Sequence, residues 1–307
     1  MLGLQEIQEA ARRIAPYVHK TPLLTSRSLD ALLGKTLLFK GEHLQKTGSF
    51  KARGALSKAL TLKGAKGLLA VSSGNHAQGV AYAARVLGVP ALVVMPEEAS
   101  PFKKAATRAL GAEVVDRGVT PENREEVVRA LLEETGYALI HPFDDPLVMA
   151  GQGTAGLELL AQAEGLEAVL APVGGGGLLA GLATAVKALA PKVRVYGVEP
   201  EGADDARRSL ERGEIVRLKE APRTRADGVR TLSLGQNTFP VLRARVDGIL
   251  TVSEEAILEA ERLLFTRLKQ VVEPTGALAL AAVLEHGKAL PHRLALLLSG
   301  GNRDFSP

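Results

Sequence analysis

The sequence predicts an α/β protein built on parallel or mostly parallel sheets flanked by helices. From Gly67 onward, apolar runs of about five residues alternate with amphipathic stretches of about ten or more, which is typical of parallel strands joined by crossover helices. Glycines and prolines separate the segments, as between PALVVMP and PFKKAATRALG. A chain of 307 residues that is 46% hydrophobic can bury a substantial core, in one large or two modest domains.

Composition and charge exclude several classes of protein. The net charge is +4, but 38 Lys and Arg residues are interleaved with 34 Asp and Glu residues, which argues against nucleic-acid binding. No apolar stretch is long enough to span a membrane, and the N-terminus lacks a signal-peptide pattern. The absence of Cys excludes disulfides and thiol chemistry. A composition poor in Asn and rich in Arg, Glu, Leu, Ala and Pro indicates a cytoplasmic, heat-adapted protein.

The first half of the chain gives one helix, one strand and then a regular alternation. MLGLQEIQEAARRIAPYV reads as an amphipathic helix that ends near Pro16, because proline breaks a helix. Leu37–Lys40 is a short strand candidate. The alternation then predicts strands in GLLAVSS, PALVVMP, AEVVD and YALIHP, and helices in NHAQGVAYAARVLG, in PFKKAATRALG and from about Pro121 to Glu134.

We expect two domains, a small one of residues 66–145 and a large one formed by residues 1–65 and 146–307. The large domain carries a second alternation, with helices in DPLVMAGQGTAGLELLAQAEG and LLAGLATAVKALA and strands in EAVLAPV and VRVYGVEP. An arginine-rich segment, residues 202–230, breaks the pattern and is expected to be mostly loop. The last predicted elements are helices near Thr238–Arg245, Ser253–Lys269 and Thr275–Glu285, and a strand in RLALLLSGG.

The stretch KTGSFKARGA, residues 46–55, carries the group on which the functional interpretation depends. Ser49 suits the N-cap of a helix that continues through Leu60, which places Lys51 in the first helical turn. A helix N-terminus, nearby cations and the adjacent Phe50 disfavour the ammonium form of Lys51. Such a lysine can act as a nucleophile and form a Schiff base. The stretch also fits a solvated basic helix start, so the interpretation requires a partner for the amine.

Two further segments lie at the carboxyl ends of strands, where parallel sheets bind ligands. Residues 72–76, SSGNH, offer hydroxyls, an amide and the free N–H groups of a helix start, although they also fit an ordinary capped helix. Residues 174–177, GGGG, let backbone N–H groups converge on an anion at a helix N-terminus. Phosphate is the expected ligand there.

The glycine run also fits a dinucleotide site. Residues 175–180 match the loose G-x-G-x-x-A spacing, and Glu199 ends the next strand where a ribose-binding acid would lie. That interpretation leaves Lys51 and residues 72–76 without roles. Pyridoxal phosphate, with an aldehyde and a phosphate, uses all of them. Ser299, in SGGN after the last strand, is placed to reach the same crevice, although this segment also fits a plain strand-to-turn junction.

Together these motifs resemble the fold-type II pyridoxal-phosphate enzymes, and within them the threonine dehydratase and serine racemase branch. TGSFKARGA resembles the cofactor-lysine motif, SSGNHAQG the loop that covers the cofactor, GGGGLLAG the phosphate cradle and SGGN the ring-nitrogen motif. The match runs nearly from end to end and implies a two-domain, tryptophan synthase β-like fold. Because the chain stops soon after Asn302, we expect the short form without a regulatory domain.

The resemblance implies a role for each motif residue. Lys51 would carry the Schiff base and act as catalytic base, with Ser73 as a second acid/base group. The implied cofactor-binding residues are Phe50, Lys51, Asn75, Gly174, Gly175, Gly176, Gly177, Leu178, Gly228 and Ser299; Phe50 would lie against the ring, Asn75 at the ring hydroxyl, residues 174–178 at the phosphate and Ser299 at the pyridine nitrogen. The implied substrate-binding residues are Ser72, Ser73, Gly74, Asn75 and Arg124. The implied ligands of Mg²⁺ or Ca²⁺ are Glu199, the carbonyl of Ala203, and Asp205, in a segment that also fits a solvated acidic turn.

The resemblance leaves two activities open. HPFDDPLVMAGQGT resembles dehydratases, whereas Ser73, Arg124 and the segment around Glu199 match serine racemase. We expect pyridoxal-5′-phosphate-dependent deamination of L-threonine and L-serine to 2-oxobutanoate and pyruvate, with release of ammonia by α,β-elimination. The alternatives are serine racemisation and, from another class, an NAD-binding oxidoreductase or nucleotide sensor. The resemblance also implies a small amino-acid substrate, a place in isoleucine biosynthesis, and a homodimer or homotetramer.

Overall fold

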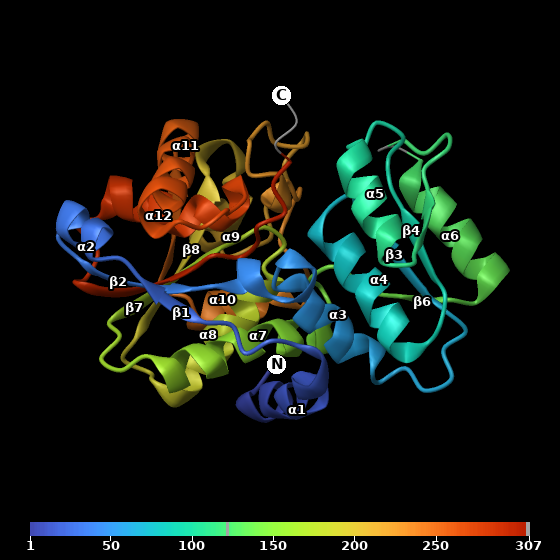
Figure 1. Cartoon of the computed structure of the whole chain (residues 1–307), viewed down its shortest axis with the longest axis horizontal. Helices are drawn as coiled ribbons and strands as arrows, with labels where there is room; N and C mark the ends of the chain where they lie inside the picture. Colours follow the sequence, from blue (N-terminus) through green and yellow to red (C-terminus); the bar gives the residue numbers. More distant parts are fainter. Residues whose placement is uncertain (121–122, 305–307) are drawn as a thin grey trace.

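The strands of the protein form two separate sheets (Figure 1). The computed structural model describes residues 1–120 and 123–304. The larger sheet contains, in spatial order, β1 (Leu23–Thr25), β2 (Thr36–Lys40), β10 (Arg293–Leu297), β7 (Ala168–Pro172), β8 (Arg194–Pro200) and β9 (Gly248–Val252). Its strands pair in parallel except β1, which pairs antiparallel with β2 at one edge. The predicted α/β class with mostly parallel sheets is confirmed.

The smaller sheet is parallel and lies within residues 66–145. Its strands, in spatial order, are β5 (Glu113–Val115), β4 (Ala91–Val94), β3 (Leu68–Val71) and β6 (Ala138–Leu139). Alternate side chains of β3 and β4 face opposite layers, because successive residues of a strand point to opposite sides. One side packs with α4 (Asn75–Leu87), and the other packs with α6 (Arg124–Thr135). Helix α5 (Pro101–Ala109) lies beside α4 (Figure 1).

Helices cover both faces of the larger sheet (Figure 1). One face packs against α1 (Leu4–Ile14), α7 (Pro146–Gln162), α8 (Gly177–Leu189) and α10 (Thr238–Arg245). The other face packs against α2 (Arg27–Leu33), α11 (Glu254–Leu263) and α12 (Pro274–His286). Helix α3 (Lys51–Ala59) packs against both α4 and α7, so it connects the two sheet units. In the part of the chain that the structure describes, no helix has the length and apolar character needed to cross a membrane.

Most predicted elements are confirmed, two expectations need correction, and three elements were not predicted. Residues 202–230 are largely loop, as expected, although α9 (Asp205–Arg212) lies within them. The expected helix over residues 253–269 is α11 followed by a π-helical turn, Leu264–Leu268. Strands β1 and β9 and helix α2 were not predicted. Ser49 does not cap α3: it pairs with Gly300 in an extended conformation, and Phe50 occupies the N-cap position. The expected helix start at Pro121 lies outside the described residues, and the two-domain division stays a prediction.

Candidate active site

Lys51 lies at the first turn of α3, next to the end of β10. The Phe50 N–H donates to the Ser299 carbonyl at 3.1 Å, which fixes the chain just before the helix against that strand end. The Lys51 Nζ donates to the Pro142 carbonyl at 2.8 Å and lies 5.2 Å from the centroid of the Phe50 ring. Burial of the amine lowers the pKa of Lys51 to about 8. Roughly a tenth of the Lys51 amine is therefore neutral and nucleophilic at pH 7, far more than for an exposed lysine.

The polar loop of residues 72–75 connects β3 to α4. Its residues are half-buried, and the Ser72 Oγ accepts a hydrogen bond from the Gly74 N–H at 3.2 Å. His76, just inside α4, is buried, and its Nε2 lies 2.7 Å from the Ile140 carbonyl. Burial and, secondly, the charge of Lys51 lower the pKa of His76 to about 3. His76 is therefore neutral and packs beneath the loop, as a buried helix residue would.

The Asn75 side chain is held by two residues from the other sheet unit. Its Nδ2 donates to Glu273 Oε1 at 2.6 Å, and its Oδ1 accepts from Asn302 Nδ2 at 2.7 Å. Sequence reasoning did not assign Glu273, although its position directly before Pro274 at a helix start was visible. Asn302 was visible in SGGN, but its partner was not. Both residues are therefore additions to the predicted site.

The four glycines of residues 174–177 form the turn between β7 and α8. Gly176 has φ +94°, a conformation that favours glycine. A Cβ on Gly177 would lie 2.6 Å from Gln152 Oε1, and one on Gly175 would overlap the Phe143 ring. Leu178 follows, buried in the first turn of α8. Close packing against Phe143 and Gln152 therefore leaves no room for side chains at Gly175 and Gly177. The turn ends at the N-terminus of α8, where backbone N–H groups without intrahelical partners suit a phosphate.

The remaining predicted cofactor residues border this turn or the end of β10. A Cβ on Gly174 would lie 3.5 Å from the Gly228 carbonyl and 3.3 Å from the Thr231 hydroxyl, which has no partner among the described residues. The Gly228 N–H donates to Thr275 Oγ1 at 2.9 Å. The Ser299 hydroxyl is also buried without a partner in residues 1–120 and 123–304. Buried hydroxyls without partners are rare, so both point to a polar ligand.

Arg124 is the predicted substrate residue that the structure does not bring to this cluster. It is exposed at the first residue of α6, and α6 packs on the opposite side of the smaller sheet from α4. Figure 1 shows α6 at the outer side of the smaller sheet unit. In the described part of the chain, no hydrogen bond or ion pair joins Arg124 to residues 72–75. Its role stays a prediction.

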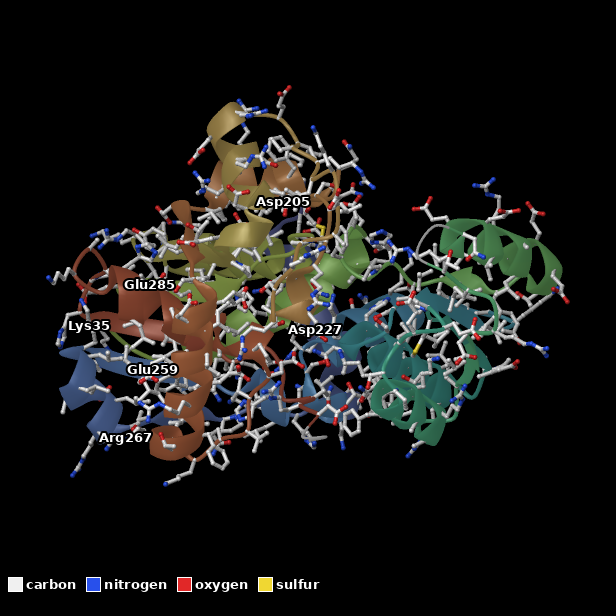
Figure 2. The ribbon with its side chains drawn as sticks, turned by 90° about the horizontal axis from the view of Figure 1, so that it is seen from above. Lys35, Asp205, Asp227, Glu259, Arg267 and Glu285 are labelled. Atoms are coloured by element: carbon white, nitrogen blue, oxygen red, sulfur yellow. The ribbon has the colours of Figure 1, made fainter. Side chains whose placement is uncertain are left out.

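The predicted metal ligands form a separate cluster at the end of β8. Figure 2 shows Asp205 on α9, away from Asp227, which lies between the two sheet units. Glu199 accepts hydrogen bonds from the Arg207 and Ala206 N–H groups at 2.8 Å and 3.2 Å. Burial raises the pKa of Glu199 to about 9 and that of Asp205 to about 7. The Asp205 Oδ2 has no partner in the described chain, and within that chain no group of three or more His, Cys, Asp or Glu residues could hold a metal.

Comparisons with known proteins agree on one family. A family model described as pyridoxal-phosphate dependent enzyme matches residues 14–300. An L-threo-3-hydroxyaspartate ammonia-lyase of Saccharomyces cerevisiae is 46% identical, covering 98% of this chain and 93% of the relative. A serine racemase of Bos taurus is 42% identical, covering 99% and 94%. Among solved structures, a threonine deaminase of T.th. is 80% identical with a TM-score of 0.97, covering 99% of this chain and all of that one.

Proposed function

This chain belongs to the family of pyridoxal-phosphate-dependent enzymes, and on that premise we propose that it deaminates L-threonine, and also L-serine, by α,β-elimination. The products are 2-oxobutanoate from threonine, pyruvate from serine, and ammonia from both. The observation that carries this choice of substrate is the 80% identity, over nearly the whole chain, to a threonine deaminase. The relatives also include serine racemases and ammonia-lyases for a different hydroxy amino acid. Family membership alone therefore does not determine the substrate.

The residues around Lys51 fit pyridoxal phosphate. The amine of Lys51 would bond to the aldehyde, and Phe50 would lie against the ring. Residues 174–178 would bind the phosphate through backbone N–H groups, with Gly228 beside them. Ser299 supports this fit independently, because its buried hydroxyl lacks a protein partner in the described chain and can donate to a pyridine nitrogen. Asn75 would donate to the ring hydroxyl.

The Lys51 amine, the Pro142 carbonyl and the polar loop of residues 72–75 would carry the reaction. When bound, the cofactor supplies the electron withdrawal that weakens the Cα–H bond of the amino acid. Lys51 would accept the Cα proton, since the lowered pKa leaves neutral amine available. The Pro142 carbonyl, 2.8 Å from Nζ, would orient that amine. The N–H groups of Ser73 and Asn75 would bind the substrate carboxylate at the start of α4. The Ser72 and Gly74 N–H groups already donate to the Val94 carbonyl and to Ser72 Oγ.

We expect L-threonine and L-serine to give oxo acids faster than L-serine gives D-serine. The expectation follows from residues 141–154, which resemble the corresponding segment of dehydratases, and from the similarity to a threonine deaminase. An oxo-acid assay and a chiral analysis of the same serine reaction measure both rates. D-Serine forming faster than pyruvate would make racemisation the main activity. L-threo-3-Hydroxyaspartate belongs in the same assay, and a kcat/KM for it above that for L-threonine would contradict the proposed substrate.

Serine racemisation is the second candidate activity. A maize serine racemase is 41% identical with a TM-score of 0.95 and covers 99% of this chain and 94% of that one. Ser73, half-buried in the polar loop, would supply the second acid/base group that a racemase requires on the other side of Cα. The Lys51 amine can remove the Cα proton on its own side but cannot add a proton on the opposite side. Ser73→Ala is therefore expected to lower racemisation more than elimination.

We also infer that Glu199, Asp205 and the carbonyl of Ala203 hold a divalent cation, Mg²⁺ or Ca²⁺. Two neighbouring buried carboxyls, one with an unpartnered oxygen, are more stable when a cation compensates their charge. Chelation is therefore expected to lower the Tm by roughly 5 °C. Glu199→Gln should abolish that sensitivity, whereas Glu201→Gln, an exposed acid nearby, should retain it. Equal sensitivity to chelator in the two variants would exclude this site.

A further inference from the structure

One amide at the active site joins the two sheet units. Asn75 begins α4 on the smaller sheet, whereas Glu273 precedes α12 and Asn302 follows β10 on the larger sheet. The amide donates to Glu273 at 2.6 Å and accepts from Asn302 at 2.7 Å. Both ends of the Asn75 side chain are therefore occupied by residues from the other unit, which restricts its rotation.

The hydrogen bonds also determine which end of the Asn75 amide faces which partner. The Thr47 carbonyl can only accept, so the Asn302 atom 2.8 Å from it is its NH₂ group. That NH₂ group also contacts Asn75, so the Asn75 atom facing it must be the amide oxygen. The Asn75 nitrogen therefore faces Glu273. It has two hydrogens, of which Glu273 accepts one and the second can reach a ligand.

Glu273 is an unusual residue for this location. It is 4% exposed, and Asp227 is a like charge nearby. Burial, then Asp227, raise the pKa of Glu273 to about 8, while Asn75, Lys103 and the Asn302 backbone oppose this rise. Lys103 of α5 pairs with Asp227 across the two sheet units. Burying a carboxyl costs free energy, because the charged form loses its hydration. A useful role for Glu273 must therefore come from the groups that it contacts.

We propose that Glu273 is a positioning residue that acts through Asn75: by accepting one N–H of the amide, it aims the other N–H at the ring oxygen of the cofactor. The inference rests on the cofactor-binding part of the proposed function and is independent of the substrate. It requires a hydrogen-bond acceptor at position 273, at the length of a glutamate side chain. A side chain of the same bulk that cannot accept a hydrogen bond would not position the Asn75 amide, and neither would a carboxyl that does not reach it.

Three variants separate the acceptor from charge and bulk. Glu273→Gln keeps an acceptor oxygen but cannot ionise, Glu273→Met keeps the bulk without a strong acceptor, and Glu273→Asp keeps a carboxyl but withdraws it from Asn75. The dissociation constant of pyridoxal phosphate is measured by equilibrium dialysis and by the visible absorption of the retained cofactor, without substrate. We expect the Met and Asp variants to bind ~10-fold more weakly and the Gln variant to stay within ~3-fold of wild type. The Asp variant keeps the test decisive if the Met variant does not fold.

The same variants in an Asn75→Ala background test whether the effect passes through Asn75. There the Gln, Met and Asp variants should share one dissociation constant, because the amide that Glu273 positions is absent. Glu285→Met is the matched control on α12: Glu285 bonds the Ser253 backbone N–H, and Figure 2 shows it far from Asp227. Its affinity should equal that of wild type.

Two results would overturn the role of Glu273. Equal affinities of the Gln, Met and Asp variants would show that no acceptor is needed, and a Met effect that persists without Asn75 would show that Glu273 acts by another route. A wild-type chain that never develops the visible band of the cofactor would instead contradict the proposed function itself.

Discussion

Replacing Lys51 with alanine is expected to abolish the covalent attachment of the cofactor and to lower turnover by at least ~10³-fold. Lys51 is the lysine at the start of α3 whose desolvated amine has a pKa of about 8. Without it, no amine is placed to bond the aldehyde or to accept the Cα proton. Borohydride reduces the Schiff base and removes its visible band, so the near-ultraviolet absorption of the cofactor that survives dialysis reports the attachment. An oxo-acid assay reports the turnover.

Lys58 provides the control for this experiment. It lies on the same helix and is paired with Asp145 at 2.8 Å, so Lys58→Ala removes a lysine of α3 outside the cluster around Lys51. Its absorption spectrum after borohydride and its kcat should stay near wild type. If Lys51→Ala kept borohydride-stable cofactor and near-normal turnover, another lysine would be the reactive one.

The core of the fold was predictable because its strands are buried on both faces. Strands such as β3 and β7 read as continuous apolar runs with turn residues on either side, and long amphipathic stretches follow them. Strand β9 did not give this signal, because it lies at the sheet edge and most of its residues are only partly buried. Helix α9 was missed because its charged sequence, DARRSLER, contains only two apolar residues, Ala206 and Leu210.

The site was predictable where its chemistry is local in sequence. The functional groups of the lysine stretch, the polar loop and the glycine turn each lie within one short segment, which is either a strand-to-helix connection or the start of a helix. Glu273 could not be found this way, because it meets Asn75 across 198 residues of sequence. The same holds for the Pro142 carbonyl, which contacts Lys51 across 91 residues. Contacts of this kind depend on how the two sheet units pack against each other, and a local sequence pattern does not predict that packing.

Ser299 is the residue whose substitution should redirect the reaction. Its side chain ends in a buried hydroxyl with no partner in the described chain, at the end of β10. A hydroxyl is neutral and can donate a hydrogen bond, so it is compatible with an unprotonated pyridine nitrogen. Under the proposed function, this leaves electron density near Cα, where it helps to expel the β-hydroxyl of the substrate.

Replacing Ser299 with aspartate is expected to lower elimination by ~10²-fold and to increase release of pyridoxamine phosphate. A carboxylate beside the pyridine nitrogen would raise the pKa of that nitrogen, because an opposite charge stabilises the cation. A protonated ring withdraws more electron density from the substrate Cα, which slows loss of the β-hydroxyl. A proton can then be added at the former aldehyde carbon of the cofactor, which leads to pyridoxamine phosphate. Oxo-acid formation and chromatography of the released cofactor measure the two outcomes. Ser299→Ala, which leaves the ring neutral, should change both much less. If the aspartate variant folds, binds the cofactor and eliminates at the rate of the alanine variant, then Ser299 does not face that nitrogen.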